Sequence, residues 1–166
     1  LSQNWYSIRP DLGRLDSSAG MILLGEGQGR FQGISSGRSG LEILGECRNS
    51  IIADFNHDGR SDILATQTLG QAQLYLGQSE KRGIRLMFDS KIELAKRLGC
   101  SVHLSYSNET SSPSRWLHSG DGVLAQCSSE AVLGFKEWPS SIQIVWSDGE
   151  MQTILVRPEI YEYTAQ

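Results

Sequence analysis

The chain has 166 residues, of which 39% are hydrophobic and 20% are charged, and its formal net charge is −4. This composition is typical of a folded globular protein and argues against an intrinsically disordered one. The acidic balance argues against a nucleic-acid-binding protein, which needs a concentrated basic surface to neutralise phosphates. Because the sequence lacks a run of about 18 apolar residues, it predicts no membrane span.

Short apolar runs bounded by glycines predict β-strands in the first half of the chain. The 18 glycines, with no long helical pattern, favour short strands joined by tight turns. The run at 21–24, followed by a glycine-rich segment, predicts a first strand, and residues 32–40 are expected to form a surface loop. Three more strands are predicted at 50–53, 62–66 and 73–76. We expect these four strands to form one antiparallel sheet, the size of one β-propeller blade.

The polar stretch at 77–83 interrupts this strand pattern and predicts a domain boundary. We therefore expect a first domain over residues 1–79 and a second over residues 83–166. Beyond the boundary, Ile84, Leu86 and Phe88 alternate with polar residues, as do residues 102–106, which indicates strands with one buried face. Residues 93–98 have room for about one helical turn.

A hairpin is predicted near the end of the chain, around Asp148-Gly149. Asp-Gly between two strand patterns is typical of a two-residue type I′ turn, which would pair Trp146 with Met151. That register places five apolar residues on one face: Ile142, Ile144, Trp146, Met151 and Leu155. Such a core face predicts a small β-sandwich for the second half and an all-β protein as a whole.

Residues 54–62 carry oxygen-bearing side chains at the spacing of a calcium loop. Those at positions 1, 3, 5 and 9 of the loop are Asp54, Asn56, Asp58 and Asp62. Gly59 stands at position 6, where the chain must turn sharply, and Arg60 at position 7 would supply its carbonyl oxygen. Calcium prefers roughly six to eight oxygen ligands, and three carboxylates this close repel one another without a cation. The pattern therefore predicts a structural Ca²⁺ site between two strands.

Two other structures could explain this loop, an EF-hand and a solvated acidic turn. An EF-hand needs a bidentate glutamate at position 12 and helices on both sides, but Ala65 stands at that position and both flanks are strand-like. A solvated acidic turn would use Asp, Asn and Gly for turn chemistry alone. Five matching positions favour the calcium loop over both.

Residues 52–64 resemble an FG-GAP or VCBS repeat, a β-propeller blade with a calcium loop similar to those of integrin α-subunits. The second half resembles an ASPIC/UnbV domain, through residues 83–86, 98–102, 118–122 and 144–149. The resemblance implies a terminal propeller blade followed by an ASPIC/UnbV-like β-sandwich in a secreted, cell-surface or periplasmic protein. Since blades pack against neighbouring blades, it also implies that further blades precede Leu1 in a longer protein.

The expected function is non-catalytic binding or adhesion, with a protein or a glycan as partner. Function often resides on loops held by a rigid scaffold. The loop at 118–122 contains His118 and Asp121, and two glycines flank Asp121. This is our candidate partner-binding loop. A tight turn between strands would need the same glycines, so that alternative stays open.

The competing function is that of a carbohydrate-active enzyme or a lectin-like sugar-binding domain. The match of residues 33–37 to G-x-S-x-G lacks a buried strand before it and a helix after it. A glycosidase would need two convergent carboxylates, yet the unassigned acids show no informative spacing: Glu26, Glu42, Glu46 and Asp121. Trp116, Trp138 and Trp146 could stack on sugars, although tryptophan is more often core. We therefore expect no catalytic residues.

The three cysteines show no metal-binding spacing. They allow one disulfide, between Cys100 and Cys127, or three small core residues that include Cys47.

Overall fold

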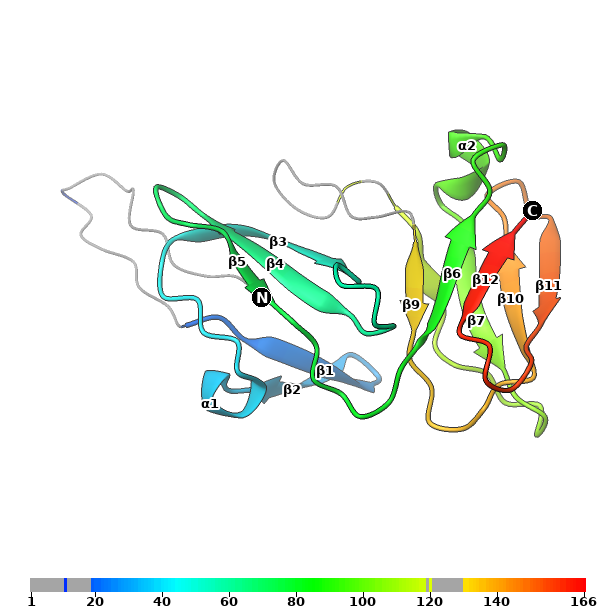
Figure 1. The fold of residues 1–166 in the computed structure, drawn as a ribbon, viewed down its shortest axis with the longest axis horizontal. Coiled ribbons are helices and arrows are strands. Elements are labelled where there is room, and N and C mark those ends of the chain that lie inside the picture. The colour runs from blue at the N-terminus through cyan, green and yellow to red at the C-terminus, as the bar shows by residue number, and fades with distance from the viewer. Residues whose placement is uncertain (1–10, 12–18, 119, 121–129) are drawn as a thin grey trace. The chain divides into compact units, whose positions relative to one another are not determined.

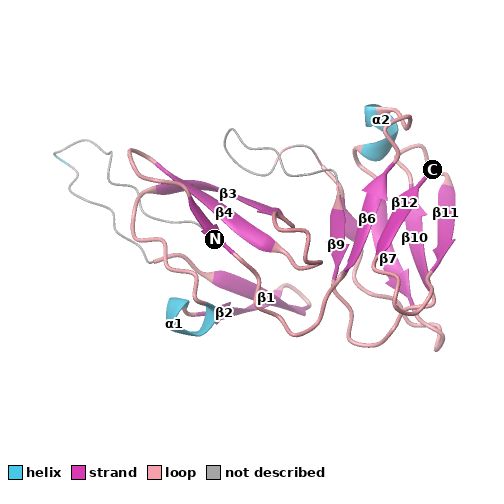
Figure 2. Cartoon of the chain, in the orientation of Figure 1, coloured by secondary structure: helices cyan, strands magenta, loops and turns pink. Residues whose placement is uncertain are grey.

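The computed structural model describes residues 11, 19–118, 120 and 130–166. Strands make up most of its regular structure (Figure 2), so the all-β prediction is confirmed. The chain divides into two compact units, and the second contains Ile52–Asp62, Leu76–Asp121 and Gln126–Gln166. The remainder forms the first unit. The predicted domains 1–79 and 83–166 stay a prediction.

The first unit contains a two-stranded antiparallel ribbon of β1 (Ile22–Gly27) and β2 (Arg30–Ile34). Gly27 pairs with Arg30, and the two residues between them have φ of 53° and 74°. Positive φ at both central residues is the geometry of a type I′ hairpin turn. The predicted surface loop at 32–40 is therefore wrong in its first part, which belongs to β2, and a single helical turn, α1 (Ser36–Ser39), follows.

A separate three-stranded sheet in the order β3-β4-β5 follows in the chain (Figure 1). Its strands are β3 (Cys47–Ala53), β4 (Asp62–Gln67) and β5 (Gln73–Tyr75). The predicted four-stranded sheet is wrong, because β1 pairs with β2 instead of joining the other three. The tight turn after β1 brings β2 alongside it at once, so a local partner forms its ladder.

The core of the first unit is small. Its buried apolar residues are Leu41, Ile43, Cys47 and Ala65. Several large apolar side chains of the same unit are more than two-fifths exposed: Leu23, Leu24, Phe31, Leu44, Leu69 and Leu74. This unit therefore leaves much apolar surface in contact with solvent.

The second unit has two sheets, in the orders β11-β10-β7-β8 and β12-β6-β9. Their strands are β6 (Ile84–Phe88), β7 (Ser101–Ser105), β8 (Arg115–Trp116), β9 (Ala131–Leu133), β10 (Ser141–Val145), β11 (Met151–Leu155) and β12 (Glu162–Ala165). Only the β12–β6 pair is parallel among the described strand pairs. The predicted helical turn at 93–98 is confirmed as α2 (Leu94–Arg97).

Both sheets line one hydrophobic core. Side chains from β6, β7 and β10 are fully buried in it: Ile84, Leu86, Val102, Leu104, Ile142 and Ile144. Alternate residues of a strand point to one face, which explains why the sequence pattern identified them. Trp146, only 6% exposed, closes the core beside Phe88 in an edge-to-face contact.

The predicted register of the final hairpin is wrong by one residue. Val145 pairs with Met151, Trp146 N donates to Glu150 O, and Gly149, with φ of 88°, has the only positive φ in the turn. The connection is thus a type I turn followed by a glycine bulge, with one more loop residue than a type I′ turn. A one-residue slip turns every side chain to the other face. Met151 and Leu155 are accordingly 79% and 75% exposed instead of buried.

The sequence also led to predictions about the cysteines and about membrane spans. Cys47 and Cys100 are free buried thiols, and Cys127, the predicted partner of Cys100, lies outside the described residues. Burial raises the pKa of Cys100 to about 11, as expected for an inert core thiol. No helix in the described part of the chain is long and apolar enough to cross a membrane.

Candidate metal centre

The predicted metal loop lies between two strands, as its sequence flanks indicated. β3 ends at Ala53 and β4 begins at Asp62, so the strands hold both ends of the loop. The side chains at these ends are buried, since Asp54 is 8% exposed and Asp62 is fully buried. A buried carboxylate is costly unless hydrogen bonds or a cation compensate it, so the partners of these two acids decide what the loop does.

Asp54 organises the middle of the loop through both of its carboxylate oxygens. Oδ1 accepts from the main-chain N–H of Asp58 at 3.0 Å, and Oδ2 accepts from that of Gly59 at 2.9 Å. The chain bends inward at two residues with positive φ, His57 at 59° and Gly59 at 81°. Histidine is one of the few residue types, besides glycine, that tolerates this region. The residue at position 4, His57, must therefore adopt a positive φ, which the spacing of the ligands did not predict.

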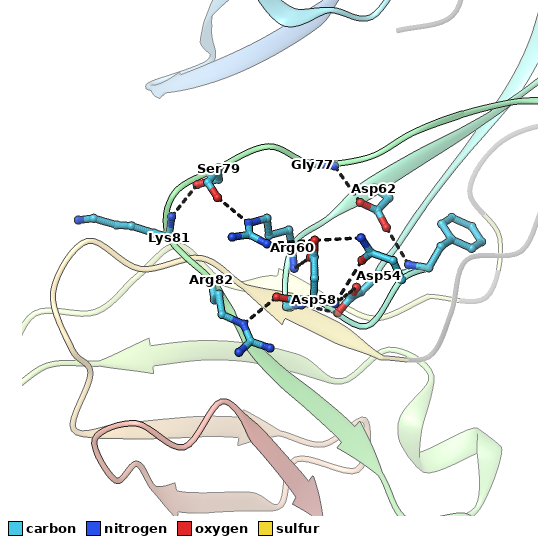
Figure 3. A network of polar contacts seen from close by, with 11 residues as sticks. Asp54, Asp58, Arg60, Asp62, Gly77, Ser79, Lys81 and Arg82 are labelled. Carbon is cyan, nitrogen blue, oxygen red and sulfur yellow. Dashed lines mark hydrogen bonds and ion pairs between the residues drawn. The ribbon is translucent and has the colours of Figure 1, made fainter.

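The side chains at positions 1, 3 and 5 converge. The Asp58 N–H that binds Asp54 also donates to Asn56 Oδ1 at 3.2 Å, so two ligand oxygens lie around one nitrogen. Asn56 Nδ2 donates to Asp58 Oδ2 at 2.9 Å. In Figure 3 the Asp54 carboxylate lies beside the main chain of Asp58, and the Asp58 carboxylate lies beside Arg60. Hydrogen bonds thus connect the residues at three of the four predicted side-chain ligand positions.

Arg60 makes an ion pair with the third of these side chains. Its Nη1 lies 3.0 Å from Asp58 Oδ2, and its main-chain N–H donates to Asp58 Oδ1 at 2.9 Å. Desolvation opposes ionisation of Asp58, but the hydrogen bonds from Asn56 and Arg60 outweigh it, so the pKa of Asp58 is lowered. The carboxylate is therefore ionised at neutral pH. Arg60 was predicted as a carbonyl ligand only, and this ion pair was not foreseen.

Asp62 is oriented differently from the other three. Its Oδ2 accepts from Phe55 N–H and its Oδ1 from Gly77 N–H, both at 2.8 Å. Within the described residues, no three acidic, histidine or cysteine side chains stand close enough to form a ready-made metal site. Figure 3 shows the Asp62 carboxylate directed toward Gly77, whereas the Asp58 carboxylate is directed toward Arg60.

A segment at 77–83, here called the strap, runs along the loop. Arg60 Nε donates to Ser79 O at 2.5 Å, Arg82 Nε donates to Asp58 O at 2.7 Å, and Gly83 N–H donates to Gly59 O at 2.7 Å. A Cβ on Gly59 would come within 3.1 Å of Arg82 Nε, so the glycine also permits this close approach. The sequence showed only a polar stretch here. No linear spacing connects Arg82 with Asp58, which lies 24 residues earlier.

The donor set suits Ca²⁺ better than a softer metal, because every candidate ligand is an oxygen. Asp54, Asn56 and Asp58 would hold the ion with their side chains, Arg60 with its carbonyl oxygen, and Asp62 with its carboxylate. Carboxylate oxygens have two lone pairs each, so each can accept an N–H and a cation together. The ion would neutralise the carboxylates and so stabilise the loop.

The candidate partner-binding loop is described only in part. His118 is exposed just beyond β8, whereas Asp121 lies outside the described residues. Among the tryptophans, Trp116 is 62% exposed on β8, and Trp138 packs edge-to-face against Phe135 and Tyr161. The G-x-S-x-G segment is preceded by the exposed strand β2 and followed by the single turn α1. It therefore has a short helix after all, but not the buried strand that a nucleophile elbow needs.

The chain was also compared with known proteins. No model of a protein family matches it. No curated protein sequence matches it either.

Proposed function

We propose that the chain is a non-catalytic, calcium-binding module that acts outside the cytoplasm in binding or adhesion. The observation that best supports the calcium site is the environment of the Asp54 and Asp62 carboxylates. Both carboxylates are buried, and within the described residues all their partners are main-chain N–H groups, with no basic side chain among them. A divalent cation would supply the missing positive charge.

Calcium has a structural role in this proposal. The candidate ligands are committed to the loop, and the loop is hydrogen-bonded to the strap through Asp58, Gly59, Arg60 and Asp62. A bound ion would therefore stabilise the loop and the strap together. Calcium is favoured over magnesium, because magnesium requires near-ideal octahedral geometry and retains its water, which a flexible acidic loop does not accommodate well.

The architecture within this proposal follows the FG-GAP/VCBS and ASPIC/UnbV resemblance. Residues 1–79, which include the metal loop, would be the last blade of a calcium-binding β-propeller, and residues 83–166 would be an ASPIC/UnbV-like β-sandwich. Two observations support it: the exposed apolar side chains of the first unit, which upstream blades would cover, and the single core between the two sheets of the second. Extracellular, cell-surface or periplasmic location follows from the same resemblance.

Calorimetric titration of the full chain with CaCl₂, and separately with MgCl₂, tests the metal site. We expect uptake of one Ca²⁺ and at least tenfold weaker Mg²⁺ binding. Asp54→Asn should weaken Ca²⁺ binding by at least about tenfold, because it removes one charged ligand. Glu80→Gln is the matched control, since it removes one charge from the strap at an exposed residue that forms no ion pair within the described residues. No Ca²⁺ uptake by the folded chain would refute the site.

Partner binding through the loop at 118–122 is tested separately. A His118→Ala, Asp121→Ala double variant should lose binding to the partner while retaining Ca²⁺ uptake. Unchanged partner binding would show that this loop is not the partner-binding site. Turnover of a glycoside, ester or peptide substrate that is lost in Ser35→Ala would overturn the non-catalytic function.

A further inference from the structure

A groove of about 620 Å³ lies in the second unit, between the loop that joins β7 to β8 and the segment that follows β9. Its lining includes Tyr106, Asn108, Phe135, Lys136 and Glu137, and no residue of the metal loop. We propose that this groove binds a neutral carbohydrate by stacking and hydrogen bonding to a pyranose ring. The inference rests on the binding function proposed above and names the chemical class of the partner.

The groove contains a rigid aromatic ring. Phe135 is half-buried, and its ring meets Trp138 edge-to-face with centroids 4.9 Å apart. Trp138 meets Tyr161 in the same way at 5.3 Å, and the guanidinium of Arg82 lies over Tyr161. A ring supported by this stack loses little conformational freedom when a ligand covers it. The apolar C–H face of a pyranose can stack on such a ring.

The polar groups in the groove include donors and acceptors that the protein does not use. Asn108 Oδ1 accepts from Thr110 N–H at 3.2 Å and from Thr110 Oγ1 at 2.6 Å, which fixes the amide. Within the described residues, neither Asn108 Nδ2 nor the Tyr106 hydroxyl makes a hydrogen bond. Sugar hydroxyls donate and accept together, so they need a mixed set of partners of this kind.

The charges in the groove favour a neutral ligand. Lys136 and Glu137 are adjacent and exposed, and neither forms an ion pair within the described residues. Their charges cancel, so an anionic ligand would gain from Lys136 but be repelled by Glu137. Both side chains can still hydrogen-bond to hydroxyl groups.

A peptide fits this groove less well. Peptides that bind in an extended form add to a free strand edge through their main chain. The β7–β8 loop uses its own main-chain groups internally, since Tyr106 N–H donates to Thr110 O and Ser112 N–H donates to Leu104 O. The groove therefore offers side chains rather than a strand edge.

The test is an array of neutral oligosaccharides of glucose, galactose, mannose and N-acetylglucosamine, probed with the full chain in the presence of a calcium chelator. Binding of the best oligosaccharide is then measured by calorimetry for three groove variants: Asn108→Asp, Glu137→Gln and Phe135→Ala. Asn108→Asp keeps the acceptor that fixes the loop. It removes the free donor and adds one negative charge to the groove. Trp116→Ala is the matched control, because it removes an exposed aromatic side chain outside the groove.

We expect binding without calcium and an affinity loss of about three- to tenfold for Asn108→Asp and Glu137→Gln. Phe135→Ala should lose at least about tenfold, with its melting temperature measured to separate unfolding from lost contact. Trp116→Ala should bind like the parent chain. Absence of carbohydrate binding, dependence on calcium, loss only in Trp116→Ala, or preference for peptides on a parallel array would each overturn the proposal. Because the assay contains a chelator, carbohydrate binding is measured without bound Ca²⁺, separately from the metal titration.

Discussion

Arg82 Nε donates a hydrogen bond to the main-chain oxygen of Asp58 at 2.7 Å, although 24 residues separate them in the chain. This bond joins the middle of the proposed metal loop to the strap at 77–83. Because Asp58 is also a candidate ligand, any event that orders the loop should order the strap as well. Ligand binding to one folded element stabilises every element that is ordered with it.

Calcium should therefore protect the strap from trypsin, which cleaves after Lys81 and Arg82. We expect cleavage in the strap to be slower with Ca²⁺ than with a chelator, as measured by mass spectrometry of timed digests. In Arg82→Gln, cleavage after Lys81 should be about five- to tenfold faster, since one hydrogen bond to the loop is lost. Glu80→Gln is the control for the sequence change. If a chain shown by calorimetry to bind Ca²⁺ is cleaved at equal rates with and without the ion, Ca²⁺ binding does not order the strap.

The lowered pKa of Asp58 predicts a pH-dependent contribution to stability. A depressed carboxyl pKa stabilises the fold above the unfolded value of about 4 and loses this effect as pH falls through the lower folded value. With a chelator present, Asp58→Asn should have a lower melting temperature than the parent chain at pH 7. The difference should shrink as the pH falls below about 4. Thermal melts by circular dichroism across this range would test it, and a constant difference would contradict it.

The bulge at Gly149 predicts a residue-specific cost for substitution. Its φ of 88° is a conformation that β-branched residues strongly resist. Gly149→Val should destabilise the chain by about 1–3 kcal/mol in urea unfolding. Gly149→Asn should cost less, because asparagine tolerates positive φ. Equal losses for the two variants would show that backbone conformation is not the cause.

The observed register of β11 predicts opposite outcomes for two apolar truncations. Ile144 is fully buried, so Ile144→Ala should cost about 2–5 kcal/mol. Leu155 is 75% exposed, so Leu155→Ala should change the free energy of unfolding by less than about 0.5 kcal/mol. Urea unfolding of both variants tests this directly. A core-like loss for Leu155→Ala would restore the register that the sequence predicted.

The sequence by itself determined features that depend on near neighbours in the chain. The strands on both sides of residues 54–62 were predicted correctly, as was the buried alternation at Ile84 and Leu86 and at Ile142 and Ile144. Strand period and strand propensity act within a few residues, so a linear pattern carries them.

Only the tertiary structure decided which strands pair, in what register, and what contacts the loop. One extra residue in the turn before Met151 reversed the faces of β11, because side chains alternate with a period of two. The tertiary structure likewise decided the partner of β1, which pairs with β2 rather than with the later strands. The strap bonds and the groove beside Phe135 join residues far apart in sequence. Such contacts depend on how whole strands pack, and no local spacing records them.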